Sequence, residues 1–397
     1  MADKLVLAYS GGLDTSVAIP WLKERYGVDV ITLTADMGNV EDLEAIRQKA
    51  LKTGAIAAEV RDARAQFLKD FVWPALQADA LYEGTYPLAT ALGRPLIAAM
   101  LVEVARGYGA TMVAHGCTGK GNDQVRFDVG VGALAPELKI VAPAREWGMT
   151  REQEIAYAQK HNIQVAAANK TFSTDENLWG RSIESGPLED PWNEPPEAAY
   201  LWTRPIDKTP NAPRYVVVTF ERGLPVAVDG ETLSPIAMVE LLSKAAGEHG
   251  VGRIDMIEDR LVGIKSREVY EAPAAAVLLP AHRALETMTL AKDQIRFKDR
   301  VAQEYAELVY NGLWYSSHRN DLQAYIDSTQ KFVSGEVRVR LHKGKATGVG
   351  VKSPHALYQY GLATYGKGDA FNQSAAPGFI ELWGLPVRVQ TRVQGER

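Results

Sequence analysis

The chain has 397 residues, of which 46% are hydrophobic and 23% charged, so we expect a soluble globular protein of two or three domains. A net charge of −5 without a basic tail argues against a nucleic-acid partner, and a single cysteine excludes an internal disulfide framework and a multi-cysteine zinc site. No apolar run reaches membrane-spanning length and no signal-peptide pattern precedes the first strand, which favours a cytoplasmic enzyme without a membrane partner.

The N-terminal part of the chain alternates strand and helix patterns. The strand-like runs are Leu5–Tyr9, Val28–Thr34, Ile56–Val60, Thr111–Ala114 and Ile140–Ala142. The helical stripes between them are Leu13–Leu22, Glu41–Thr53 and Leu96–Arg106, the last opened by Pro95. Pro20 lies within the first of these helices and predicts a bend near Ser16–Pro20. The alternation predicts an α/β fold with a doubly wound, mostly parallel sheet, in which ligands lie beyond the carboxyl ends of the strands.

Residues 8–16 read Ala-Tyr-Ser-Gly-Gly-Leu-Asp-Thr-Ser and connect the first strand to the first helix. Glycine lets the backbone come close to a ligand, and a helix N-terminus offers unpaired N–H groups that suit phosphate. The segment matches neither the Walker A nor the dinucleotide-binding pattern. It resembles instead the pyrophosphate loop of enzymes that split ATP between the α and β phosphates. The alternative is a tight turn in which Asp14 only caps the helix.

A second glycine-rich polar segment, His115–Phe127, follows the strand that ends at Ala114. Lys120 could steady phosphate charge, and the Asn122, Asp123 and Arg126 side chains could hold the ammonium and carboxylate groups of an amino acid. The alternative is a solvated loop with an aspartate helix cap. A site made of both segments requires the turns at Gly11–Gly12 and Gly119–Gly121 to converge at one edge of the sheet.

The rest of the chain predicts an α+β second domain and a C-terminal arm. We interpret residues 171–213 as an irregular connection because they are rich in Pro, Trp, Glu, Asn and Ser. Strands are predicted at Tyr215–Phe220, Val226–Val228 and Arg260–Ile264, with a hairpin of Val337–His342 and Thr347–Val351 around Gly344. Helices are predicted from Ser234-Pro235 to Glu248 and at Ala275–Gln294, Lys298–Val309 and Asn320–Phe332. The predicted domains are 1–168 for ATP, 169–356 for the substrates, and 357–397 as an arm that holds Phe379–Leu385 and packs on another subunit.

Several segments together resemble the argininosuccinate synthetase family. They occur in order along most of the chain: Ala8–Ser16, Tyr82–Leu88, Arg94-Pro95, His115–Phe127, Ser173–Leu178, Gly252–Asp255 and Lys265–Glu271. The resemblance implies an ATP-dependent C–N ligase that joins L-citrulline and L-aspartate into argininosuccinate in arginine biosynthesis. It also implies ATP as co-substrate, Mg²⁺ with it, and a homotetramer.

The resemblance places the family's binding positions on residues of matching type. ATP would contact Ala8, Tyr9, Ser10, Gly11, Gly12, Leu13, Asp14, Thr15, Ser16, Ala35 and Gly116. Citrulline would contact Tyr86, Asn122, Arg126, Ser173, Ser182, Glu258 and Tyr270. Aspartate would contact Thr118, Asn122 and Asp123. We predict a part in catalysis for Asp14, Lys120 and Asp123, and no residue is predicted to bind a metal.

The chemistry that the resemblance implies has two steps. The ureido oxygen of citrulline attacks the α-phosphate of ATP and releases pyrophosphate, and the amino group of aspartate then expels AMP from the citrullyl-adenylate. Alignment alone can supply roughly 7–11 kcal/mol of the barrier, so we assign no general base. The alternatives are another pyrophosphate-loop ligase, a tRNA-thiolating enzyme and a non-catalytic nucleotide sensor. A lone cysteine beside the ATP loop disfavours a glutamine-dependent ligase, and the acidic charge disfavours a tRNA-modifying enzyme.

Overall fold

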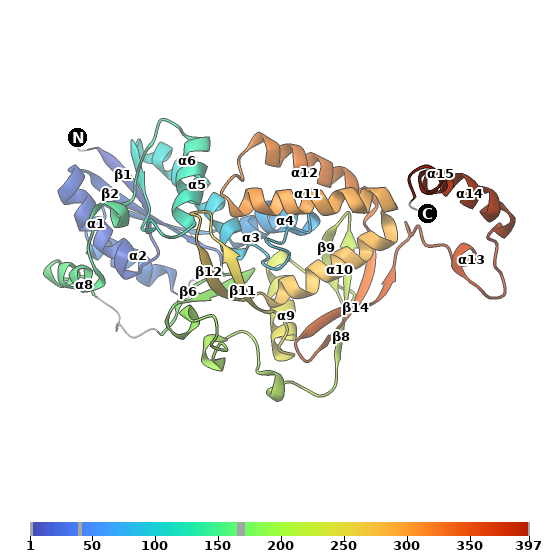
Figure 1. The fold of residues 1–397 in the computed structure, drawn as a ribbon. Coiled ribbons are helices and arrows are strands. Elements are labelled where there is room, and N and C mark those ends of the chain that lie inside the picture. Colours follow the sequence, from blue (N-terminus) through green and yellow to red (C-terminus); the bar gives the residue numbers. More distant parts are fainter. Residues whose placement is uncertain (1–2, 39–41, 165–170, 396–397) are drawn as a thin grey trace. The chain divides into compact units, whose positions relative to one another are not determined.

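The computed structural model describes residues 3–38, 42–164 and 171–395, and Figure 1 shows the elements that they form. The chain divides into two compact units, one ending at His355 and the other beginning at Ala356. In the described ranges, no helix has the length and apolar character needed to cross a membrane.

The first sheet is parallel, with strands in the order β3-β2-β1-β4-β5. Its strands are β1 Lys4–Ala8, β2 Asp29–Asp36, β3 Ala57–Asp62, β4 Met112–Ala114 and β5 Lys139–Val141. Along β1, Val6 packs in one hydrophobic cluster with α5, whereas Leu5 and Leu7 pack in another with α1. Successive side chains of a strand point to opposite faces, so helices cover both faces of this sheet. The predicted doubly wound α/β fold is confirmed.

The helices of this part largely follow the predicted pattern. They are α1 Leu13–Tyr26, α2 Leu43–Lys52, α3 Arg64–Phe67, α4 Trp73–Gln77, α5 Ala89–Tyr108, α6 Asp123–Leu134, α7 Pro143–Glu146 and α8 Arg151–Lys160. Pro20 lies inside α1, which continues through the predicted bend to Tyr26. The predicted start of α5 after Pro95 is wrong, because the helix begins at Ala89 and Pro95 lies inside it. Burial of Leu92 and Leu96 in the core offsets the backbone hydrogen bond that proline removes.

Two antiparallel sheets follow in the same unit. One has the order β11-β12-β7-β6, and the other β10-β9-β8-β13-β14. Their strands are β6 Ser173–Asn177, β7 Gly180–Glu184, β8 Arg214–Glu221, β9 Leu224–Val228, β10 Glu231–Thr232, β11 Arg253–Asp259, β12 Lys265–Glu271, β13 Gly335–His342 and β14 Lys345–Lys352. The helices are α9 Pro235–Glu248, α10 Pro273–Thr289, α11 Lys292–Tyr310 and α12 Ser317–Thr329.

The predicted hairpin and the predicted cap of α9 are confirmed. In the hairpin, His342 pairs with Lys345, and the two turn residues have φ values of +46° and +81°, as a type I′ turn requires. Ser234 caps α9 by accepting the Ala237 N–H at 3.3 Å.

Two predictions in this region are wrong. Residues 260–264 are not a strand but the turn between β11 and β12, closed by hydrogen bonds from Arg260 N–H to Ile264 and from Gly263 N–H to Arg260. The stretch 171–213 is not wholly irregular, because it contains β6 and β7. These strands are polar, since one face of their sheet carries candidate site residues, and a hydrophobic pattern could not show them.

The second unit consists of α13 Tyr360–Ala363, α14 Ala376–Trp383 and α15 Leu385–Gln394. None of the described residues of these helices is buried. Large apolar side chains are exposed along α14 and α15: Phe379, Ile380, Leu382, Trp383, Leu385, Val387, Val389 and Val393.

Candidate active site

The first glycine turn joins β1 to α1. Gly11 has φ +75°, which glycine adopts without strain, and Gly12, whose N–H donates to Ser10 Oγ at 3.3 Å, is the N-cap of α1 and has no side chain to cap the helix. The N–H groups of the first helical turn are therefore open to an anion. Ser10 Oγ lies 3.2 Å from Thr15 Oγ1, and Ser16 Oγ donates to the Gly12 carbonyl at 2.7 Å. The alternative interpretation, in which Asp14 only caps α1, is wrong because the N-cap residue is Gly12.

The second glycine turn lies beside the first. It follows β4, which pairs with β1 in parallel, and the strand order runs outward in opposite directions from this pair. Open α/β sheets bind ligands at such a switch point. A Cβ atom on Gly116 would lie 2.9 Å from Thr15 Cγ2, so the two turns are in contact. The predicted convergence of the two segments is confirmed.

Hydrogen bonds from buried side chains hold the second turn. His115 Nδ1 accepts the Cys117 N–H at 3.2 Å, and its Nε2 lies 2.8 Å from Asp128 Oδ1. Gln124 Nε2 donates to the Gly119 carbonyl at 2.6 Å. Burial raises the pKa of Cys117 to about 12, so this thiol is not a nucleophile.

The start of α6 gathers the predicted amino-acid-binding side chains. Asp123 accepts from Arg94 Nη2 at 2.7 Å and from Arg126 Nη1 at 2.9 Å, and Asn122 is the N-cap without a side-chain cap bond. Burial raises the pKa of Asp123, but the two arginines outweigh it and bring the pKa down to about 2. Arg126 Nη2 is buried and has no hydrogen-bond partner among the described residues, which is the position that a ligand carboxylate would fill.

One face of the β11-β12-β7-β6 sheet carries the other predicted citrulline residues. Ser182 on β7 lies opposite Tyr270 on β12 and opposite Asp175 on β6. Ser173 is two residues from Asp175 and therefore on the same face. The Tyr270 hydroxyl donates to Glu258 Oε2 at 2.6 Å, which brings Glu258 into the same group.

Glu258 is a buried carboxylate, 2% exposed, between two phenol groups. It accepts from Tyr270 at 2.6 Å and from Tyr310 at 2.5 Å. Burial raises its pKa, and the two hydroxyl donors lower it by less. Tyr86 stacks on Tyr270 with ring centroids 4.1 Å apart. A carboxylate held in this way suits an ammonium group.

The remaining predicted residues lie around the two turns. Tyr9 is buried, and its hydroxyl lies 3.1 Å from Ser16 Oγ. Asp14 accepts from Arg151 Nη1 at 2.6 Å. Thr118 and Lys120 are exposed in the second turn, whereas Ala8, Leu13 and Ala35 are half-buried at the ends of β1, α1 and β2.

Sequence reasoning missed three residues of this region. Arg94 donates to Asp123 and also to Asp175, and it was visible only as part of a matched segment without a role. Arg151, on α8, forms an ion pair with Asp14, which lies in the first turn of α1, next to the first glycine turn. Tyr310 contacts Asn122, Arg126 and Glu258, and nothing in the local sequence of α11 marks it.

Two cavities in the first unit, of about 850 and 560 Å³, are lined by none of the predicted site residues. The site is therefore identified by its converging polar groups and the switch point of the sheet, not by a closed pocket.

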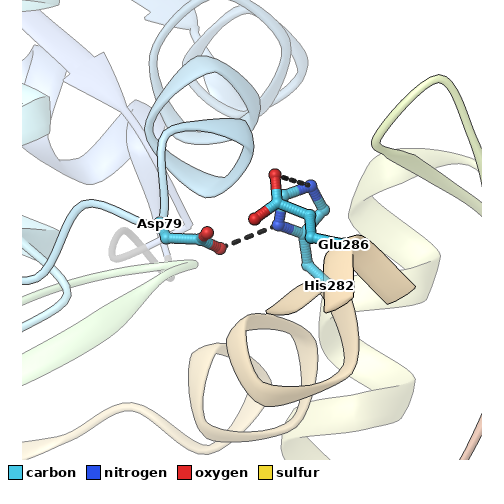
Figure 2. Close-up of side chains that lie close together, drawn as sticks. All are labelled: Asp79, His282 and Glu286. Carbon is cyan, nitrogen blue, oxygen red and sulfur yellow. Dashed lines mark hydrogen bonds and ion pairs between the residues drawn. The ribbon is translucent and has the colours of Figure 1, made fainter. Parts of the chain in front are cut away.

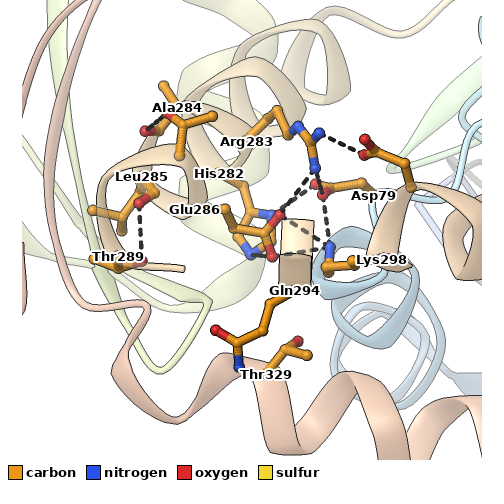
Figure 3. Close-up of polar contacts among 12 residues, drawn as sticks. Asp79, His282, Arg283, Ala284, Leu285, Glu286, Thr289, Gln294, Lys298 and Thr329 are labelled. Atoms are coloured by element: carbon orange, nitrogen blue, oxygen red, sulfur yellow. Dashed lines mark hydrogen bonds and ion pairs between the residues drawn. The ribbon is translucent and has the colours of Figure 1, made fainter. Parts of the chain in front are cut away.

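A second cluster of charged residues lies outside this site. Asp79, His282 and Glu286 lie close enough together to be ligands of one metal ion (Figure 2). The Lys298 ammonium, however, lies 2.6 Å from Asp79 and 2.9 Å from Glu286 (Figure 3). A cation already occupies the position between the carboxylates, so we interpret the cluster as a buried ion-pair network that stabilises the fold.

The fold, with two glycine turns at the switch point of its parallel sheet, is of the nucleotide-binding α/β type. Residues 4–164 match the arginosuccinate synthase N-terminal HUP domain, and residues 172–390 match the arginosuccinate synthase C-terminal domain. The chain belongs to the argininosuccinate synthase family.

Relatives support this assignment over nearly the whole chain. The argininosuccinate synthase of Dehalococcoides mccartyi is 60% identical over 99% of this chain and 97% of its own length. That of Gloeobacter violaceus is 58% identical over 99% of both chains. Among solved structures, a tRNA thiolase from Methanococcus maripaludis is 16% identical with a TM-score of 0.26, covering 43% of this chain and 60% of its own, and carries no argument. The predicted family and enzyme class, an ATP-dependent ligase, are confirmed, and the alternative classes are set aside.

Proposed function

We propose that this chain joins L-citrulline and L-aspartate into argininosuccinate, using ATP and releasing AMP and pyrophosphate. Membership of the family supports this activity. The structural observation that carries it is the contact of the two glycine turns at the β1/β4 switch point, because a nucleotide there lies next to the residues that begin α6.

ATP binds with its phosphates on the first turn. The open N–H groups at the start of α1 and the hydroxyls of Ser10 and Thr15 suit anionic oxygens, whereas the buried Ser16 hydroxyl donates to the Gly12 carbonyl and holds the turn. These groups are neutral and Asp14 is paired with Arg151, but the Lys49 ammonium donates to the Gly11 carbonyl at 2.6 Å and brings one positive charge to the turn. The rest of the phosphate charge needs a cation that the nucleotide brings. Mg²⁺ bound with the nucleotide would supply that neutralisation, and Lys120 can add to it from the second turn. We assign no protein ligand to the metal.

Citrulline binds with its amino-acid end between Arg126 and Glu258. The unpartnered Nη2 of Arg126 takes the carboxylate, and Glu258 takes the ammonium group. Tyr86, Ser173, Ser182 and Tyr270 surround the rest of the molecule. Aspartate binds at Thr118, Asn122 and Asp123, where the Asp123 carboxylate, with its pKa lowered to about 2 by Arg94 and Arg126, is ionised at neutral pH.

The reaction then needs alignment more than acid–base chemistry. The ureido oxygen of citrulline forms a bond to the α-phosphorus as the bond to the β-phosphate oxygen breaks, and pyrophosphate leaves. The aspartate nitrogen next forms a bond to the ureido carbon as the bond from that carbon to the AMP oxygen breaks. The nitrogen loses its proton in this second step. Well-oriented reactants can gain roughly 7–11 kcal/mol in this way.

The test is the substrate dependence of the products. We expect AMP and pyrophosphate release from the wild-type protein only when ATP, citrulline and aspartate are all present. Citrulline without aspartate should support isotope exchange between pyrophosphate and ATP. Exchange without citrulline, or ligation with ammonia in place of aspartate, would refute the proposed function.

The wider organisation is also a proposal. Residues 1–168 bind ATP, 169–356 complete the substrate site, and 357–397 are an arm that forms a homotetramer. The exposed apolar side chains of α14 and α15 support the arm, because such surfaces are usually covered by a partner. The single cysteine, which leaves the chain without internal disulfides, fits the reducing cytoplasm that we propose as its location.

A further inference from the structure

Tyr310, the last residue of α11, links two candidate site residues through its hydroxyl group. The side chain is 1% exposed. It donates to Glu258 Oε1 at 2.5 Å and accepts from Asn122 Nδ2 at 2.8 Å. The directions are fixed, because an ionised carboxylate can only accept and an amide nitrogen can only donate. Asn122 cannot turn over, since its Oδ1 accepts the Leu261 N–H at 2.9 Å.

The ring and backbone of Tyr310 hold a third site residue. Arg126 Nε donates to the Tyr310 carbonyl at 2.9 Å, and its guanidinium carbon lies 4.8 Å from the ring centroid. Tyr82 stacks on the same ring with centroids 3.5 Å apart and a 3° angle between the planes. The ring therefore has one supporting aromatic neighbour and one cationic neighbour, and it fixes where the guanidinium lies.

We propose that Tyr310 is a positioning residue for the amino-acid end of citrulline, an inference that rests on the function proposed above. A single side chain sets the spacing between Glu258, which takes the ammonium group, and Arg126, which takes the carboxylate. It also ties both to Asn122 at the start of α6, next to the second glycine turn. The ammonium and carboxylate groups of an amino acid lie at a fixed separation, so the protein charges that bind them must also be held at a fixed separation. Tyr310 connects the two charged residues, Glu258 and Arg126.

The pH dependence of citrulline use gives this role a distinct signature. The titratable and charged groups that act on Glu258 are Tyr82, Tyr86, Arg126, Arg260, Glu268, Tyr270 and Tyr310. Burial raises the pKa of Glu258, and the hydroxyl of Tyr310 is one of the groups that lower it. Without this hydroxyl the pKa of Glu258 rises further. On acidification, Glu258 is therefore protonated, and loses its negative charge, at a higher pH than in the wild type.

The test compares Tyr310→Phe with Tyr305→Phe. Tyr305 is a matched control: it lies on the same helix, is fully buried, and its hydroxyl donates to Gln323 at 2.8 Å, away from the site. In Tyr310→Phe we expect the citrulline KM to rise about tenfold to hundredfold, because the variant loses the hydrogen bond to the Glu258 carboxylate and also the one that Asn122 donates. The ATP KM should stay within about twofold, because removing uniform binding of one substrate changes its KM alone. The acid limb of kcat/KM for citrulline should move to higher pH, and Tyr305→Phe should change none of these values.

A double variant shows whether Tyr310 acts through Glu258. In Glu258→Gln the charge that Tyr310 supports is gone, so adding Tyr310→Phe should multiply the citrulline KM by much less than it does in the wild type. An unchanged citrulline KM and pH profile in Tyr310→Phe, or an equal rise in KM for all three substrates, overturns the positioning role alone. A wild-type protein that makes no argininosuccinate overturns the proposed function, and this inference with it.

Discussion

Replacing Lys298 with methionine tests whether the buried ion-pair network stabilises the fold. Lys298 is fully buried, and its ammonium lies 2.6 Å from Asp79 and 2.9 Å from Glu286. Methionine keeps most of the length of the side chain but leaves the buried Glu286 and the partly buried Asp79 without this cation. His282 bonds to Asp79 at 2.8 Å, and the Arg283 guanidinium lies 3.8 Å from Asp79 and 3.6 Å from Glu286, so these two groups compensate in part.

The expected loss is large for a single substitution. Breaking a buried ion pair by removing one partner costs about 3–5 kcal/mol. A unit of more than 200 residues loses about 2 °C of melting temperature per kcal/mol, so Tm should fall by about 6–10 °C. The variant Lys292→Met, on an exposed residue at the start of the same helix, should stay within about 0.5 kcal/mol of the wild type.

The assay is thermal unfolding of both variants at several pH values. Burial raises the pKa of Glu286, and loss of the Lys298 charge raises it further, so the folded Lys298→Met variant holds the Glu286 proton more tightly than the unfolded chain, and acidification stabilises it relative to neutral pH. The Tm difference between Lys298→Met and wild type should therefore shrink as the pH is lowered. Equal Tm values for the two methionine variants, or a difference that is the same at every pH, would refute the reasoning.

Three further outcomes are expected. Gly116→Ala should raise the ATP KM in steady-state assays by about tenfold, because the added Cβ would lie 2.9 Å from Thr15. In the control variant Gly132→Ala the added Cβ meets no atom within 4 Å, so the ATP KM should be unchanged. Leu382→Glu should dissociate the oligomer, read by light scattering during size-exclusion chromatography, and an unchanged mass would count against the arm. Asp123→Asn should slow the complete ligation at least tenfold more than pyrophosphate–ATP exchange, and equal losses would contradict a role in aspartate use.

The parallel sheet and the first glycine turn were predictable because their sequence signals are local. β2 is a near-continuous β-branched run, as expected for a strand covered on both faces, and the glycine turn comes directly after β1. The same local rules failed at α5, where Pro95 was taken as a helix start. Packing of the apolar face of α5 decides where this helix begins, and a rule based on the position of proline does not include the free energy of that packing.

The polar sheet was not predictable from periodicity. β6 reads Ser-Thr-Asp-Glu-Asn because one of its faces carries residues of the candidate site. β11 reads Arg-Ile-Asp-Met-Ile-Glu-Asp, and its site residue Glu258 shares a face with Ile254 and Met256, while its other charged side chains lie on the opposite face. Tyr310 is a stronger case. It is 52 residues from Glu258 and 188 from Asn122 in sequence, so only the fold brings the three together. The resemblance to the family pointed to the residues that would contact ligands, but not to Tyr310, which holds several of those side chains in position.

Asp123 shows why residue type alone leaves a chemical role open. By type it could accept the proton that the aspartate amine loses. Burial raises its pKa, yet Arg94 and Arg126 bring it down to about 2, and a base this weak takes a proton poorly at neutral pH. A carboxylate that stays ionised is better suited to hold the incoming amino acid than to deprotonate it. We therefore expect Asp123→Asn to raise the aspartate KM without moving the pH profile of kcat. A shift in that profile would restore the general-base role and contradict the binding role argued from the two arginines.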